Sequence, residues 1–160
     1  ICMMPGAEYG PAKQWPVYYY KKLAASITAA GGQVWVIGSE KDRAAGDTIT
    51  ADSGDNVHNL CGETQLVDTV DLLACAAAVV SNDSGLMHVA AALGVQLNVI
   101  YGSSTPDYTP PLTTPDKCNI FYLALDCSPC FKRVCPLGHT DCLNKIAVDQ
   151  VYQKISPLLT

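Results

Sequence analysis

The chain has 160 residues, 49% of them hydrophobic, with a formal net charge of −5 at pH 7 and a sequence pI near 4.9. This length fits a single domain, 1–160, with a sizeable core, and the acidic balance argues against a nucleic-acid partner, because binding a phosphate backbone needs clustered Lys and Arg. The longest apolar run near the middle, 72–80, is far shorter than the ~20 residues of a membrane-spanning helix, so we expect no transmembrane segment.

Short apolar runs alternate with helical patterns from the start of the chain. The first run, ICMM, has no initiator methionine, basic segment or cleavage site of the signal-peptide kind, so we expect this chain to be a piece of a longer protein. Further strand-like runs follow at 33–38, 57–62, 77–82 and 97–102. Several are continuously apolar, which indicates a sheet covered on both faces. We therefore predict an α/β fold with a Rossmann-like, doubly wound parallel sheet.

Two helical patterns separate these strands. In the first, Gly31 and Gly32 supply the stop, and the apolar residues recur at three- and four-residue spacing: Val17, Tyr20, Leu23, Ala24 and Ile27. In the second, we expect Thr64 to cap a helix. Its apolar residues are expected to form one apolar stripe: Leu66, Val67, Val70, Leu73 and Ala74.

After Gly102 the pattern changes to SSTPDYTPPLTTPDK, whose prolines and hydroxyls predict an irregular loop. A strand at 119–125, a Cys-rich loop at 126–143 and an amphipathic helix from about Ala147 to just before Pro157 are expected to complete the chain.

One strand-to-helix junction carries candidate binding chemistry. The buried strand ending at Asn82 leads into a small-residue helix whose free N–H groups and dipole favour a phosphate, and Gly85 permits close approach of a ligand. Ser84 adds a hydroxyl, and His88 lies one turn later on the same helix face. Asp83 would repel a diphosphate, so we expect it to cap the helix or to accept hydrogen bonds from sugar hydroxyls. The alternative is a purely structural set, with Asp83 as a cap, Gly85 as a packing glycine and His88 in the core.

A second junction lies after the first strand. The segment PGAEYGPAKQWP places Lys13 in a Gly/Pro loop at the same edge of the sheet. Its ammonium group could neutralise a diphosphate leaving group, and the alternative is a solvated surface lysine.

Four segments together resemble glycosyltransferase family 9: PGAEYGPAKQWP, GSEKDR, SNDSGLMHVAAALG and YGSSTPDYTPPL. The similarity runs from Ile1 to about Leu125 and implies the C-terminal half of a GT-B glycosyltransferase, with the N-terminal acceptor domain absent from this chain. It further implies an inverting transfer of L-glycero-D-manno-heptose from ADP-heptose to the inner core of lipopolysaccharide, with no metal required. The full-length protein is then expected in the cytoplasm, peripheral at the inner membrane.

The resemblance also implies roles for individual residues. It places Lys13 at the phosphates of the donor and Asp83 beside the sugar. It places the diphosphate at the helix start formed by Ser84, Gly85 and His88.

Two further donor contacts are implied, Glu40 at the ribose and Thr64 beside the adenine. The general base falls in the absent N-terminal domain, so no catalytic residue is expected in this chain. Two alternatives remain open: a non-catalytic nucleotide-binding or zinc-stabilised interaction module, and a GT-B sugar-nucleotide epimerase domain.

The segment CSPCFKRVCPLGHTDC places four cysteines, Cys127, Cys130, Cys135 and Cys142, within sixteen residues, with His139 among them. A CxxC pair suits tetrahedral zinc, and Cys135 with either Cys142 or His139 could complete the site. Reduced structural thiols and disulfides are the alternatives. The transfer does not need this cluster, so a metal here would be structural.

Three other cysteines, Cys2, Cys61 and Cys75, lie in apolar segments, where a free thiol behaves as a small hydrophobe. This placement favours a cytoplasmic protein over a secreted disulfide scaffold.

Overall fold

The computed structural model describes residues 1–159 and contains one six-stranded parallel sheet. The strands are β1 (Cys2–Met4), β2 (Val34–Val36), β3 (Val57–Asn59), β4 (Val79–Asn82), β5 (Leu97–Ile100) and β6 (Cys118–Phe121). They lie in the order β3-β2-β1-β4-β5-β6, with every neighbouring pair parallel. The chain therefore runs outward from β1 to β3, returns to β4 beside β1 and runs outward again. This is the order of a Rossmann-like doubly wound sheet, and the predicted fold class is confirmed.

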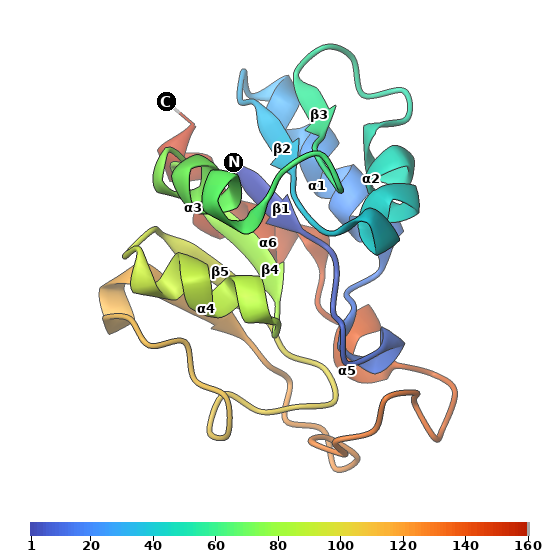
Figure 1. Cartoon of the computed structure of the whole chain (residues 1–160). Coiled ribbons are helices and arrows are strands. Elements are labelled where there is room, and N and C mark those ends of the chain that lie inside the picture. The colour runs from blue at the N-terminus through green and yellow to red at the C-terminus, as the bar shows by residue number, and fades with distance from the viewer. Residues whose placement is uncertain (160) are drawn as a thin grey trace.

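Helices cover both faces of the sheet (Figure 1). On one face lie α1 (Val17–Ala29), α2 (Arg43–Thr50), α5 (Asp141–Asn144) and α6 (Val148–Ile155), and on the other lie α3 (Leu66–Ala74) and α4 (Gly85–Ala92). Strand β1 shows why its sequence is continuously apolar. Met3 belongs to the core under α1, whereas Cys2 and Met4 belong to the core under α3 and α4, and all three side chains are buried.

Short 3-10 helices complete the chain: η1 (Pro11–Lys13), η2 (Glu40–Asp42), η3 (Pro115–Lys117) and η4 (Ser156–Leu158). The first and last predicted helices are confirmed as α1 and α6. Helix α1 ends before Gly31, which adopts a positive φ of 84° and donates its N–H to Thr28. Helix α6 begins after Ala147, whose N–H donates to Gln150 Oε1 at 2.9 Å. No helix within residues 1–159 is both long and apolar enough to span a membrane.

The predicted cap of helix α3 is wrong, and its apolar stripe is only partly buried. Its N-cap residue is Gln65, whose N–H donates to Asp68 Oδ2 at 2.9 Å, whereas Thr64 lies one position earlier and its hydroxyl is 3.2 Å from that of Thr69. The helix buries Thr69 and Leu73, while the first two residues of the expected stripe, Leu66 and Val67, are 64% and 67% exposed. Neither residue belongs to the apolar core that contains Leu73, so the first turn of α3 lies outside that core.

Candidate functional site

Two adjoining cavities open at the carboxyl edge of the sheet, beside the ends of β1 and β4. This is the point where the strand order reverses, and ligands of open α/β sheets bind there. The larger cavity, of about 440 Å³, is largely apolar, and its lining includes Met4, Ile37, Leu66, Leu86 and Val89. The smaller, of about 230 Å³, is polar and lined by Glu8, Tyr9, Lys13, Asp83, Ser84, Gly85, His88 and Thr109. The two share Glu8, Ser84 and Gly85, so they meet at the start of α4.

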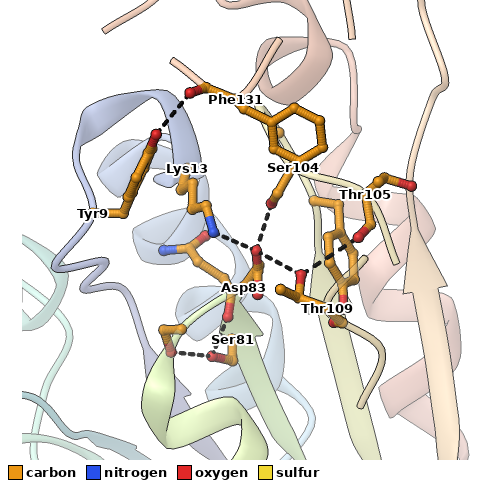
Figure 2. Close-up of polar contacts among 12 residues, drawn as sticks. Tyr9, Lys13, Ser81, Asp83, Ser104, Thr105, Thr109 and Phe131 are labelled. Carbon is orange, nitrogen blue, oxygen red and sulfur yellow. Dashed lines mark hydrogen bonds and ion pairs between the residues drawn. The ribbon is translucent and has the colours of Figure 1, made fainter. Parts of the chain in front are cut away.

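An ion pair between Lys13 and Asp83 lies in the smaller cavity. Lys13 Nζ is 2.5 Å from Asp83 Oδ2, and the two side chains are only 14% and 3% exposed. The same oxygen accepts hydrogen bonds from Ser104 Oγ at 2.5 Å and from Thr109 Oγ1 at 3.1 Å (Figure 2). The alternative of a solvated surface lysine is therefore wrong. The positive charge of Lys13 in this cavity is therefore balanced by the negative charge of Asp83.

Contacts within the loop after β1 hold the Lys13 side chain in the smaller cavity. Lys13 ends helix η1, and its ammonium lies 5.1 Å from the centre of the Tyr9 ring. The Tyr9 hydroxyl donates to the carbonyl of Phe131 at 2.7 Å, which ties the loop to the Cys-rich loop (Figure 2). Gly10 adopts a φ of 148°, and a Cβ there would meet the carbonyl oxygen of Arg133 at 2.6 Å. A side chain at this position would push the two loops apart.

Asn82, the last residue of β4, joins this loop to the sheet. Its side-chain oxygen accepts the Trp15 N–H at 2.9 Å and the Tyr20 hydroxyl at 3.2 Å, and its side-chain N–H donates to Pro5 at 2.7 Å. The residue is fully buried, so these bonds satisfy polar groups that would otherwise be costly. Asn82 thus sets the register between the Lys13 loop and the Asp83 end of β4.

The start of helix α4 faces both cavities without a cap. Ser84 is the N-cap residue, with extended backbone, and its hydroxyl makes no capping bond and lies 3.3 Å from Ser81 Oγ. A Cβ built on Gly85 would have nothing within 4 Å. His88 is exposed and lines the smaller cavity. The structural readings of this junction are therefore wrong: Asp83 is not the cap, Gly85 packs against nothing and His88 lies outside the core. Uncapped N–H groups at a helix start can bind an anion.

Two predicted donor contacts, Glu40 and Thr64, lie outside the lining of both cavities. The carboxylate of Glu40 accepts two bonds from Arg43 Nε, at 3.0 and 3.1 Å, and this partner raises the pKa of the Arg43 guanidinium. Their neighbours Ser39 and Asp42 line the larger cavity instead. Contacts of Glu40 with ribose and of Thr64 with adenine stay predictions.

Other site residues were missed in the sequence. Glu8 lines both cavities, and an exposed ion pair with Lys41 holds the pKa of its carboxyl below the usual range. Ser104 and Thr109 come from the loop after β5, which was predicted only as irregular. The hydroxyl-rich loop that follows a buried strand at the ligand edge was the available signal for this pair.

The Cys-rich loop encloses a separate cavity of about 20 Å³, lined in part by Cys127, Cys130, Cys135, Cys142 and His139. The sequence prediction correctly grouped these residues. However, within residues 1–159 no three His, Cys, Asp or Glu side chains are arranged so that they could hold a metal ion. All eight cysteines are free thiols, so the disulfide alternative is not found in this structure.

The apolar cysteines divide between core and surface. Cys2 and Cys61 are buried as expected, and burial raises their pKa to about 11 and about 12. Cys75 is exposed at the C-cap of α3, which corrects the prediction for that residue.

Comparison with known proteins gives consistent matches along the chain. The family profile of glycosyltransferase family 9 (heptosyltransferase) matches residues 1–141. Lipopolysaccharide heptosyltransferase 2 of Salmonella typhimurium is 42% identical over 164 residues, covering 100% of this chain and 47% of the relative. The protein of the same name from Escherichia coli K12 is 43% identical over 163 residues, covering 99% of this chain and 46% of the relative.

A solved structure extends the match to three dimensions. The structure of E. coli ADP-heptose lps heptosyltransferase II superposes with a TM-score of 0.85 at 41% identity, covering 99% of this chain and 45% of that one. The chain thus spans about half the length of the relatives that it matches.

Proposed function

This chain belongs to glycosyltransferase family 9, and from that membership we propose that it is the donor-binding, C-terminal half of a GT-B heptosyltransferase. The reaction proposed for the whole protein is the inverting transfer of L-glycero-D-manno-heptose from ADP-heptose to the inner core of lipopolysaccharide. The names of the relatives support this donor and this acceptor.

The observation that carries the proposal is the pair of cavities that meet at the start of α4. The larger, apolar cavity fits a nucleoside, and Leu66 and Val89 give it apolar side chains that a base can cover. The diphosphate would lie where the cavities join, at the uncapped N–H groups after Ser84 and Gly85. The heptose would then lie in the smaller cavity, beside Asp83.

Lys13 has a defined role in this arrangement. Without the donor, its ammonium pairs with Asp83, and with the donor it would also contact the diphosphate, on the same side of the cavity. During transfer an acceptor hydroxyl attacks the anomeric carbon, the bond from that carbon to the diphosphate oxygen breaks, and ADP leaves with the electron pair. Lys13, His88 and the α4 N–H groups would stabilise the negative charge that develops on ADP. The proton of the acceptor hydroxyl would pass to a base in the N-terminal half.

Calorimetric titration of ADP, adenosine and UDP into this chain tests the proposal. We expect weak ADP binding, because contacts from the other half of the cleft are missing. Lys13→Ala should reduce affinity for ADP by at least about tenfold while leaving adenosine nearly unchanged, since a charge-assisted contact contributes about 1.5–3 kcal/mol. Lys117→Ala is the matched control, because Lys117 is an exposed lysine that lines neither cavity.

Two outcomes would contradict the assignment. Equal losses for ADP and adenosine would remove Lys13 from the phosphate site. A clear preference for UDP over ADP would favour the epimerase alternative.

A further inference from the structure

The loop after β5 supplies two hydroxyl groups to the site, and both end on one carboxylate oxygen. Ser104 Oγ and Thr109 Oγ1 donate to Asp83 Oδ2, the same atom that pairs with Lys13 (Figure 2). Ser104 is 1% exposed, so it cannot touch a ligand in the cavity. Whatever Ser104 does for the site, it does through Asp83.

The two oxygens of Asp83 are therefore unequal. Oδ2 receives three donors, which is at least as many as its lone pairs can accept. Oδ1 makes no hydrogen bond to any residue in 1–159, yet it is not a buried unpaired atom, so it retains contact with solvent. Because Asp83 lines the smaller cavity, Oδ1 is the acceptor that a ligand there would meet.

The donors are themselves held firmly, so the orientation of the carboxylate is fixed before a ligand arrives. The Tyr101 hydroxyl donates to the Thr109 carbonyl at 2.6 Å, and the Thr109 N–H donates to the Thr105 carbonyl. At the other end of the loop, Ser103 N–H donates to Ala12 in the Lys13 loop. A carboxylate held by several bonds from rigid neighbours loses little conformational freedom when it accepts another bond.

From this geometry we propose that Ser104 and Thr109 are positioning residues for sugar recognition. They occupy Asp83 Oδ2 and so present Oδ1 to a hydroxyl of the donor sugar, while their dipoles and the charge of Lys13 offset the repulsion between Asp83 and the neighbouring diphosphate. The inference rests on the proposed function. It assigns to the loop after β5 a role in selecting the sugar of the donor.

The test measures selectivity, defined as the ratio of the dissociation constant for ADP to that for ADP-heptose, by calorimetry on this chain. Thr109→Val keeps the shape and removes the hydroxyl, and Ser104→Ala removes the other donor. Each should lower the selectivity by about fivefold with little change in ADP affinity, as expected for a hydrogen bond to a charged group that is lost indirectly. Thr109→Ser keeps the hydroxyl and should restore the ratio.

The matched control is Ser128→Ala. Ser128 is also a buried hydroxyl, donating to the Gly102 carbonyl at 2.6 Å, but it does not contact Asp83. It should alter stability in urea without altering selectivity. In an Asp83→Asn background, Thr109→Val should have no further effect on the ratio, since Thr109 is proposed to act through Asp83.

Several results would overturn the inference. One is an equal loss of ADP and ADP-heptose affinity in Thr109→Val. Another is a fall in selectivity in Ser128→Ala as large as that in Thr109→Val. The third is an undiminished fall in selectivity when Thr109→Val is made in the Asp83→Asn background. A wild-type chain that binds ADP without preferring ADP-heptose would refute the sugar contact and this inference but leave the nucleotide site standing. No ADP binding at all would count against the proposed function itself.

Discussion

The Lys13–Asp83 ion pair gives a stability prediction that needs no ligand. Lys13→Met retains the aliphatic stem and removes the charge, which leaves the Asp83 carboxylate, only 3% exposed, without its counterion. Breaking a buried ion pair from one side costs about 3–5 kcal/mol. Because Ser104 and Thr109 still donate to Asp83, we expect the lower end, about 3 kcal/mol. For a chain of this length that loss corresponds to a fall in Tm of about 6–12 °C.

Removing the other charge of the pair should lower the free energy of unfolding by less. Asp83→Asn leaves the Lys13 ammonium unpaired, but this group is 14% exposed and can reach water in the cavity, so about 1–2 kcal/mol is expected. The double variant has no buried charge to compensate. It should therefore be about 2 kcal/mol more stable than the sum of the single losses predicts, a coupling in the range measured for residues in direct contact.

The free energy of unfolding is measured by urea unfolding followed by circular dichroism, with linear extrapolation to zero denaturant. The four proteins compared are the unchanged chain, Lys13→Met, Asp83→Asn and the double variant. Single losses that add to within about 0.5 kcal/mol in the double variant would refute the reasoning, because independent sites behave in that way. A double variant less stable than that sum would refute it equally.

Three other predictions concern ligand, turnover and thiols. Asp83→Asn should reduce ADP-heptose affinity more than ADP affinity in calorimetry, and equal losses would make Asp83 a scaffold residue. This chain alone should show no heptosyl transfer to a heptose-deficient inner-core acceptor, whereas adding the separately expressed N-terminal half should restore it; turnover by the chain alone would place the base here. Hydrogen bonds from backbone N–H groups, that of Thr140 first, lower the pKa of Cys135, whereas burial raises that of Cys61 to about 12. As pH rises, Cys135 therefore forms thiolate before Cys61. Iodoacetamide at pH 7.5 should label Cys135 before Cys61 in a mass-spectrometric time course. Labelling of Cys135 only after treatment with a chelator would instead support the predicted zinc.

The fold class could be predicted from the sequence because the apolar patterns of its strands and helices are local along the chain. The continuous apolar run at β1 predicts burial on both faces, and Met3 and Cys2 lie in the two opposite cores. The strand-to-helix junction at Ser84 and Gly85 likewise predicted an open helix start, since both the strand and the small-residue helix are local features.

Tertiary structure decided what those local signals could not. Whether Leu66 and Val67 are core or surface depends on how α3 packs on the sheet: both are exposed and belong to neither core, and Leu66 lines the larger cavity instead.

The polar centre of the site is the clearest case. The sequence predicted Lys13 and Asp83 separately, but their pairing joins residues 70 positions apart, and Ser104 and Thr109 reach Asp83 from a third segment. Spacing along the chain carries information about neighbours on one helix or strand, because their geometry is fixed by the repeat of that element. Contacts between loops depend instead on the order and register of the strands that bring them to one edge, and only the assembled sheet determines these.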